Sequence, residues 1–257
     1  MTQLLRVTNL SRRFGGLVAV DNLSFDVEKG SITGIIGPNG AGKTTVFNLI
    51  SGQLTPGAGE VRFNGHAVGG LPPYERVQLG MCRTFQSTVL YNDSTVFENL
   101  LRGYAARHRA GFRACIPGTR ASAASEAGMH ARAAQLLDFV DLAHSRDELA
   151  RNLPYGHQRA LGVAIGLATD PALIMLDEPV AGMNPRESAD IARLIRRVNQ
   201  AGTTVLLVEH DMQFVMQLCG RIVAIANGAK IAEGTPAQIQ ADPAVISAYL
   251  GDDDGEA

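Results

Sequence analysis

The chain has 257 residues, of which 46% are hydrophobic and 19% are charged, and this composition excludes a mainly disordered protein. Its 23 basic and 25 acidic residues leave a net charge of −2, which argues against a dedicated DNA-binding protein. The cysteines, Cys82, Cys115 and Cys219, stand at irregular spacing, so we expect reduced, buried thiols and neither disulfides nor a zinc site. The sequence shows no signal-peptide segment and no run of the ~20 apolar residues that cross a bilayer, so we expect a soluble chain that meets a membrane only as a peripheral partner.

The first third of the chain is predicted to be rich in strands. Short apolar segments bounded by Gly, Asn or Asp indicate strands at residues 4–10, 23–27, 31–37 and 60–64. A helix is expected to begin after Gly42 and to end at Ser51, because Gly52 follows.

The middle of the chain, residues 95–150, has a different pattern that is rich in Ala and Arg. Apolar residues recur there every three to four positions, as in an amphipathic helix, at Met129, Ala133, Leu136, Leu137 and Val140. We interpret this stretch as a helical subdomain inserted into an α/β core.

Strands and helices alternate again in the last third. Continuous apolar runs predict strands at residues 172–176 and 203–208, with an amphipathic helix at 191–198 between them. Such strands separated by helices indicate a parallel sheet that is covered on both faces. Two last strands, 222–226 and 230–233, are expected to form a hairpin at Asn227-Gly228, and the tail at 252–256 is expected to be frayed.

The sharpest motif is residues 37–44, Gly-Pro-Asn-Gly-Ala-Gly-Lys-Thr, which fit the phosphate-binding pattern G-x-x-x-x-G-K-[ST]. Glycines let successive backbone N–H groups turn towards a polyanion, and the following helix directs the positive end of its dipole at the same phosphates. In this pattern Lys43 contacts the β- and γ-phosphates and the Thr44 hydroxyl ligates Mg²⁺. The alternative is a Gly-rich surface loop, which the flanking strand and helix disfavour. The candidate nucleotide-binding residues here are Gly37, Pro38, Asn39, Gly40, Ala41, Gly42, Lys43, Thr44 and Thr45.

Three further candidates follow buried strands. Asp177 would hold Mg²⁺ beside the phosphate loop, and Glu178 would activate the water that attacks the γ-phosphate. His210 follows the next strand and is a candidate for a hydrogen bond to the γ-phosphate. The alternative is that these are solvated residues at strand ends.

Taken together, these residues resemble the nucleotide-binding subunit of an ABC transporter over nearly the whole chain. The resemblance implies that Phe14 stacks on adenine, that Gln86 ligates Mg²⁺ in a loop that senses the membrane subunit, and that His210 is the switch histidine. Without it, Phe14 would be expected to pack into the β-subdomain and Gln86 to be an ordinary loop residue. The segment 181–184 is similar to the family's loop that crosses the dimer interface.

One motif departs from the family pattern. The signature Leu-Ser-Gly-Gly-Gln is replaced here by Leu153, Pro154, Tyr155, Gly156 and His157. In the family this segment faces the γ-phosphate held by the other subunit, whereas Pro154 has neither a hydroxyl nor an N–H group. The resemblance therefore implies a weakened site on the partner subunit.

Three regions resemble the longer ATPase of branched-chain amino-acid importers: residues 44–48, an insertion at 100–129 and the ending at 234–251. Urea and other amide importers share much of this pattern. The insertion carries five arginines and no acidic residue between Leu100 and Ser125; they are Arg102, Arg107, Arg109, Arg113 and Arg120. They predict a patch that attracts anionic lipid head groups, with a solvated helix face as the alternative.

The resemblance implies one α/β domain of the ABC ATPase fold. It would combine a P-loop NTPase (RecA-like) core with an antiparallel β-subdomain at 1–86 and 153–234, an inserted helical subdomain at 87–152 and a C-terminal extension at 235–257. The implied function is the ATP- and Mg²⁺-dependent ATPase that powers an importer of branched-chain or other hydrophobic amino acids. The alternatives are ATPases for urea or amide import or for lipid export, and a soluble ABC ATPase that acts on DNA or the ribosome.

The same resemblance implies partners and a location. The chain would pair with a second ABC ATPase subunit in a heterodimer, with two integral-membrane permease subunits and, indirectly, with a solute-binding protein. It would lie at the cytoplasmic face of the membrane and bind no nucleic acid.

Overall fold

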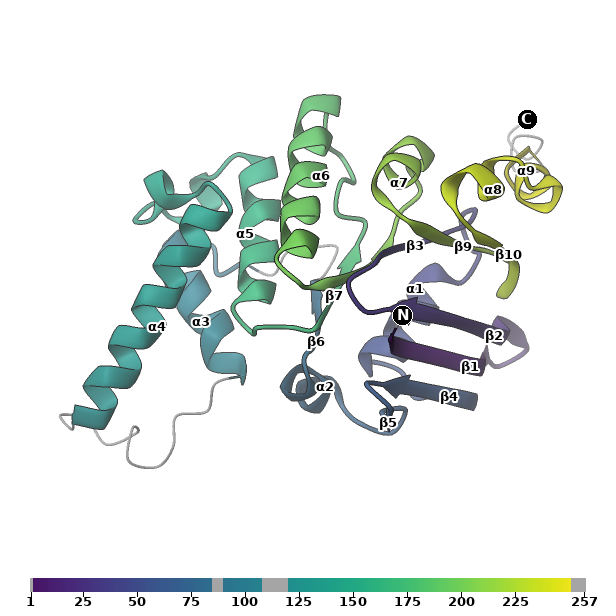
Figure 1. Cartoon of the computed structure of the whole chain (residues 1–257), viewed down its shortest axis with the longest axis horizontal. Helices are drawn as coiled ribbons and strands as arrows, with labels where there is room; N and C mark the ends of the chain where they lie inside the picture. The colour runs from purple at the N-terminus through teal and green to yellow at the C-terminus, as the bar shows by residue number, and fades with distance from the viewer. Residues whose placement is uncertain (1, 85–89, 108–119, 251–257) are drawn as a thin grey trace.

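The computed structural model of the chain describes residues 2–84, 90–107 and 120–250, and its described strands form two sheets (Figure 1). The smaller sheet is antiparallel with the order β2-β1-β4-β5, from β1 (Gln3–Phe14), β2 (Leu17–Glu28), β4 (Ala58–Phe63) and β5 (His66–Ala67). The larger sheet has the order β10-β9-β3-β8-β7-β6, from β3 (Ile32–Ile36), β6 (Met81–Thr84), β7 (Leu173–Asp177), β8 (Thr204–Val208), β9 (Arg221–Ala226) and β10 (Ala229–Gly234).

The larger sheet is parallel except for its edge strand β10, which runs antiparallel to β9 and forms with it the expected hairpin at Asn227-Gly228. Its strands β3, β7 and β8 are buried at every residue. In β8, Val205 and Leu207 face one hydrophobic core, whereas Leu206 and Val208 face another. The continuous apolar runs of the sequence therefore reflect burial on both faces of a parallel sheet.

One of the two cores lies between the sheets, where α1 (Lys43–Ser51) contributes Val46, Phe47, Leu49 and Ile50 (Figure 1). The other core lies under helices on the opposite face, namely α5 (Tyr155–Leu167), α6 (Pro185–Gln200), α7 (Met212–Leu218), α8 (Pro236–Gln240) and α9 (Pro243–Leu250). At one end of the molecule α3 (Val96–Arg107) and α4 (Arg120–Phe139) pack on α5, in the region expected to be helical. α2 (Pro73–Leu79) precedes β6.

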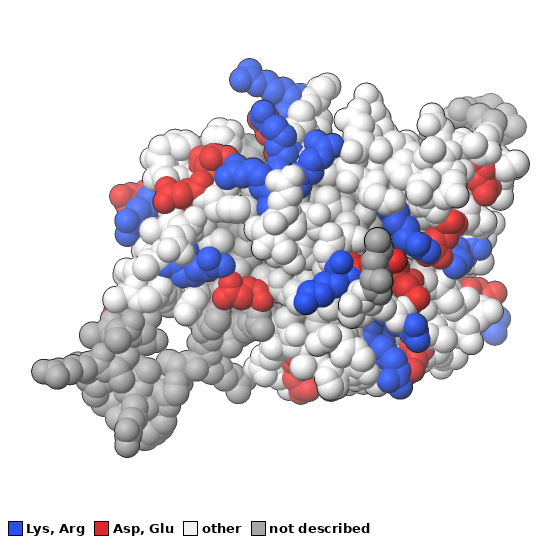
Figure 2. Space-filling view, viewed as in Figure 1, with Lys and Arg blue, Asp and Glu red and all other residues white. Residues whose placement is uncertain are grey.

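The helix α6 begins sharply because its start is capped on both sides. The Asn184 side chain accepts hydrogen bonds from the backbone N–H groups of Arg186 and Glu187, each at 3.0 Å. In return, the Glu187 carboxylate accepts one from the Asn184 N–H at 3.1 Å, and Pro185 occupies the first helical position. The helix α6 carries Arg186, Arg193, Arg196 and Arg197. Figure 2 shows basic side chains gathered over this helix.

Most elements expected from the sequence are present, with differences at their ends. β1 and β2 extend to 12 residues each, well beyond the apolar segments 4–10 and 23–27. The helix expected around 129–140 is the second half of a 20-residue α4. The expected tail at 252–256 lies outside the described residues, and none of the helices that the structure describes has the length and hydropathy of a membrane span.

Two of the cysteines are buried free thiols, as expected. Burial raises the pKa of Cys82 to about 11 and that of Cys219 to about 12, so both thiols stay protonated at neutral pH. Cys115 lies outside the described residues.

Candidate functional site

The candidate phosphate loop joins the buried strand β3 to the helix α1, the context that its motif requires. Gly42 precedes α1 with φ = 97°, a left-handed conformation. A Cβ atom at this position would lie 2.3 Å from the carbonyl oxygen of Ala19. Only glycine fits, and the chain can therefore turn so that the first N–H groups of α1 face the loop.

Lys43 is the first residue of α1 and is only 8% exposed. Its ammonium group donates hydrogen bonds to the carbonyl oxygens of Gly37 at 2.6 Å and of Pro38 at 2.8 Å. These contacts curl the loop around the lysine and hold its charge at the loop. A positive charge at a loop of this motif is suited to a polyphosphate.

A cavity of about 460 Å³ lies against this loop. It brings together residues that are far apart in the sequence: Phe14, Leu17, Val18 and Ala19 from the smaller sheet, residues 39–45 from the loop and α1, and Glu178 and Asn227 from turns that follow strands of the larger sheet. The Phe14 ring is 43% exposed, with the guanidinium carbon of Arg12 5.2 Å from its centroid. An exposed aromatic ring beside a phosphate loop offers a face on which a base can stack.

Asp177 and Glu178 lie at the carboxyl end of β7 in different environments. Asp177 is buried, and its Oδ2 accepts a hydrogen bond from Arg83 Nη2 at 2.6 Å. Glu178 lines the cavity and has φ = 45°, which is uncommon for a residue with a side chain. Its N–H group donates to the carbonyl oxygen of Val208 at 3.0 Å, so the neighbouring strand β8 holds this conformation. A strained residue that lines the cavity is typical of a functional position.

The residues at the phosphate loop fit a magnesium ion. Thr44 lines the cavity and brings a hydroxyl group, and Asp177 brings a carboxylate at the end of β7, which β8 separates from β3 in the sheet. Mg²⁺ is usually held by one or two protein oxygens together with water and phosphate oxygens. The described residues contain no cluster of three or more His, Cys, Asp or Glu side chains, so they fit a shared site of this kind and not an all-protein cage.

His210 follows β8 and has a side chain that is 58% exposed, whereas the neighbouring Glu209 is fully buried. The Glu209 carboxylate accepts hydrogen bonds from the N–H groups of Val180 at 3.0 Å and of His210 at 3.1 Å. Burial raises the pKa of Glu209 above its usual range. Glu209 therefore ties the turn after Glu178 to the turn that carries His210, a role that the sequence analysis did not assign.

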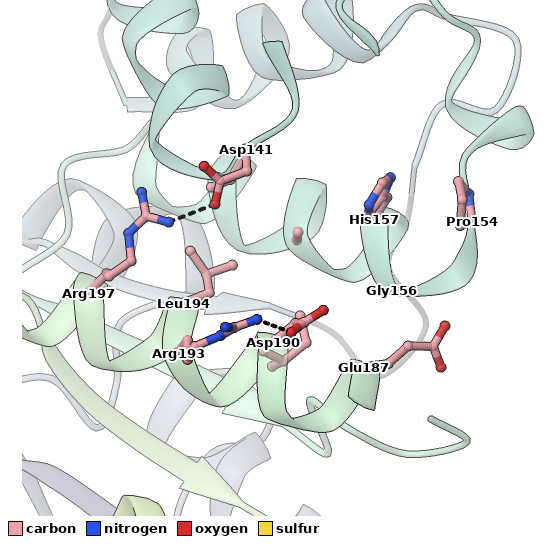
Figure 3. A pocket seen from close by; sticks show the side chains of 12 residues that line it. Asp141, Pro154, Gly156, His157, Glu187, Asp190, Arg193, Leu194 and Arg197 are labelled. Carbon is pink, nitrogen blue, oxygen red and sulfur yellow. Dashed lines mark hydrogen bonds and ion pairs between the residues drawn. The ribbon is translucent and has the colours of Figure 1, made fainter. Parts of the chain in front are cut away.

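The signature-like segment 153–157 begins α5 and lies apart from the phosphate-loop cavity, since none of the described residues that line the cavity belongs to it. Pro154 is the residue before the helix and has no side-chain hydroxyl to cap it. Pro154, Gly156 and His157 line a second cavity of about 500 Å³ against α6 (Figure 3). Ion pairs of Arg197 with Asp141 and of Arg193 with Asp190 lie on its other side.

Tyr155 connects this segment to the loop before α6. Its hydroxyl donates a hydrogen bond to the carbonyl oxygen of Ala181 at 3.1 Å and accepts one from Arg159 Nη2 at 2.5 Å. The Arg159 guanidinium also lies over the Tyr155 ring, 5.0 Å from its centroid. The signature-like segment and the segment 181–184 are thus joined within one chain.

Some of the expected site residues fall outside the described part of the chain. Gln86 is one of them. Of the five arginines in the insertion, only the side chain of Arg102 is described; it donates to Ser94 Oγ at 2.7 Å and packs over the Tyr91 ring. The prediction of a lipid-facing patch therefore stays a prediction.

Comparisons with known proteins agree with this geometry. A family model described as "ABC transporter" matches residues 20–181, and one described as "Branched-chain amino acid ATP-binding cassette transporter" matches residues 229–255. The chain belongs to the ABC transporter family. The first match includes the phosphate loop and the Asp177-Glu178 pair, so the resemblance on which the sequence was interpreted is confirmed.

Relatives of this ABC protein match it along almost their whole length. The high-affinity branched-chain amino acid transport ATP-binding protein BraF of Pseudomonas aeruginosa is 43% identical over 97% of this chain and 98% of its own. The high-affinity branched-chain amino acid transport ATP-binding protein LivG of Escherichia coli is 40% identical over 97% of this chain and 98% of its own. Among solved structures, the ADP conformation of an ATP-binding cassette of an ABC transporter is 32% identical, with a TM-score of 0.86 over 98% of this chain and 100% of the other. The ABC ATPase fold expected from the sequence is thereby confirmed.

Proposed function

We propose that this chain is the ATP-hydrolysing subunit of an ABC importer for branched-chain or similar hydrophobic amino acids. The observation that carries the proposal is similarity along the full chain, at 40–43% identity, to ATP-binding proteins of branched-chain amino acid transport. The match of residues 229–255 to a model of that branch supports the same substrate class.

The proposed nucleotide is ATP with Mg²⁺. Phe14 stacks on the adenine, residues 37–45 bind the phosphates through backbone N–H groups and Lys43, and Thr44, Asp177 and Gln86 hold the metal ion. When bound, the metal ion would supply positive charge against the charge that develops on the phosphates. Glu178 accepts a proton from the attacking water, and His210 hydrogen-bonds the γ-phosphate. The cavity that Phe14, Lys43, Thr44 and Glu178 share supports the assignments of these four residues.

The proposed catalytic unit is a face-to-face pair of ATPase subunits. In it, residues 153–157 complete the site on the partner subunit, and the fact that they do not line this chain's own phosphate-loop cavity supports that role. We propose a heterodimer bound to two permease subunits at the cytoplasmic face of the membrane, with a solute-binding protein acting on the far side.

The test is purification of the tagged chain from solubilised membranes, followed by reconstitution of the co-purifying complex into vesicles. The proposal expects a second ATPase and two polytopic subunits, and ATP-dependent uptake of leucine, isoleucine or valine in excess over urea. A complex that transports urea but no branched-chain amino acid would assign the chain to the amide branch. Co-purification of ribosomes or nucleic acid in place of membrane subunits would refute import altogether.

A further inference from the structure

Arg83 is a buried arginine on β6 that no motif of the sequence analysis includes. Its Nη2 donates to Asp177 Oδ2 at 2.6 Å, and the exposed fractions of the two side chains are 7% and 5%. The two residues are 94 positions apart in the sequence, and they meet because β6 and β7 are parallel neighbours, with Arg83 opposite Met175 in the ladder.

The same guanidinium also reaches α1, the helix that begins at Lys43. Arg83 Nη1 donates to Asn48 Oδ1 at 2.7 Å and to Ser51 Oγ at 3.0 Å, and it lies 3.4 Å from Gln53 Oε1. Its guanidinium carbon lies 5.5 Å from the centroid of the Phe47 ring. Arg83 is therefore held from both sides, between the helix of the phosphate loop and the strand that ends in Asp177.

This arrangement needs an arginine. A buried carboxylate is costly unless charged or polar partners satisfy it, and a planar guanidinium can serve two groups of acceptors at fixed angles. A lysine has one compact ammonium group and cannot hold both α1 and Asp177 in the same geometry. Because a carboxylate has two oxygens, Asp177 can accept from Arg83 on Oδ2 and keep Oδ1 as a second acceptor.

We infer that Arg83 is a positioning residue that sets the Asp177 carboxylate relative to Thr44 and so fixes the magnesium site. The inference rests on the proposed function, since it takes Asp177 and Thr44 as the groups that hold the metal. Partners of this kind orient metal ligands, and their removal typically weakens metal affinity by about 10- to 100-fold.

The experiment compares nucleotide and metal binding in Arg83→Met, Arg83→Lys and Asn48→Ala. Each variant is titrated with a fluorescent, non-hydrolysable ATP analogue in EDTA and in Mg²⁺, and Mn²⁺ binding to the chain–nucleotide complex is followed by EPR. Arg62→Met is the matched control, because Arg62 pairs with Glu60 on the solvated strand β4, with exposed fractions of 47% and 43%.

Arg83→Met is expected to bind the analogue in EDTA within about 2-fold of the wild type, while its Mn²⁺ affinity falls by about 10-fold or more. Arg83→Lys and Asn48→Ala are expected to weaken Mn²⁺ binding by smaller factors, and Arg62→Met to leave both affinities unchanged. Wild-type Mn²⁺ affinity in a folded Arg83→Met overturns the inference. Where circular dichroism shows that this variant does not fold, wild-type Mn²⁺ affinity in both Arg83→Lys and Asn48→Ala overturns it. A wild-type chain that binds no nucleotide would instead refute the proposed function.

Discussion

The buried carboxylate of Glu209 accepts a hydrogen bond from the backbone N–H of Val180 at 3.0 Å, across 29 residues of sequence. Its second oxygen accepts from the N–H of His210 at 3.1 Å, so one side chain joins the turns that follow two neighbouring strands. Both turns carry candidate catalytic residues, Glu178 and His210. The parallel pairing of β7 and β8 brings both turns to the same edge of the sheet, and the buried Glu209 side chain then joins the backbones of the two turns.

Glu209→Gln tests this contact through the pH dependence of folding. Burial, the largest cause, raises the pKa of Glu209 in the folded chain above its ordinary value of 4.5. The folded state therefore binds this proton more tightly, and the stability from protonated Glu209 is full below pH 4.5 and is lost as the pH rises through the folded pKa. The free energy of unfolding of the wild type relative to Glu209→Gln should fall with pH in that window, by at most about 1.4 kcal/mol per pH unit. Urea titrations at a series of pH values measure it, and a difference that grows with pH contradicts the burial argument.

Lys43→Ala should weaken ATP binding by about 10- to 150-fold, the value of hydrogen bonds to charged phosphate oxygens. The variant also removes the contacts to Gly37 and Pro38 that shape the loop. Lys230→Ala is the matched control, because Lys230 pairs with Glu233 on the hairpin strand β10. Equilibrium titration with ATP measures the effect. Equal ATP affinity in the two variants would show that Lys43 does not bind the phosphates.

The sequence predicted the parts of this site that depend on local context. Gly42 and Lys43 are recognisable because the loop, the strand before it and the helix after it are contiguous. The strands β3, β7 and β8 were predictable because burial on both faces makes their residues mainly apolar. In contrast, β1 and β2 extend through polar residues that the apolar pattern did not include. Pairing between the two strands stabilises these extensions.

Arg83 and Glu209 were missed for a different reason. Each is an ionisable residue inside or next to a strand of the larger sheet, and a decisive partner comes from a segment far away, 94 residues for Arg83 and 29 for Glu209. The order of strands in the sheet brings those segments together, and local sequence patterns do not reveal that order. A signal was nevertheless present: a lone charge next to an apolar strand is costly to bury unless a partner meets it.

Glu178→Gln should slow ATP hydrolysis by roughly 10²- to 10⁴-fold while ATP still binds, as expected for the loss of a general base. Gln has nearly the same shape, so the positive φ of Glu178 and its backbone bond to Val208 are kept. The ATP-bound dimer should accumulate, which size-exclusion chromatography measures. Glu60→Gln, at an exposed ion pair, is the control. Unchanged turnover in the assembled transporter would show that another group activates the water.

Tyr155→Phe should lower turnover of the assembled transporter by about 2- to 10-fold, the worth of one neutral hydrogen bond felt in the transition state. The variant keeps the ring against Arg159 and removes the hydroxyl, which donates to Ala181 and also accepts from Arg159 Nη2; the bond to Ala181 is the one that joins the two segments. ATP affinity should not change, because Tyr155 does not line the phosphate-loop cavity. Tyr91→Phe, at another exposed tyrosine, is the control. A fall in ATP affinity equal to the fall in turnover would contradict a role limited to the link between the two segments.

The last prediction concerns an asymmetry between the two sites of the proposed heterodimer. The partner's signature completes the site in which residues 37–44 hold ATP. Residues 153–157 complete the site in which the partner holds ATP. Pro154, at the start of α5, offers that second ATP neither a hydroxyl nor an N–H. A lost hydrogen bond to a charged oxygen is worth about 1.5–3 kcal/mol, or roughly 10- to 150-fold in rate when felt fully in the transition state. We therefore expect the partner's ATP to be hydrolysed more slowly.

Pro154→Ser combined with His157→Gln should raise turnover at the partner's site and change the site on this chain's own loop by less than about 2-fold, since 153–157 lie outside that cavity. Each site is measured separately by first silencing the catalytic glutamate of the opposite subunit. A serine before α5 would also cap the helix and stabilise the chain by about 1 kcal/mol. Pro154→Ala separates the two effects, because alanine restores the N–H without a hydroxyl or a cap. If the double change lowers turnover, or acts equally at both sites, the proline-containing segment is a competent signature and the two sites are not unequal for this reason.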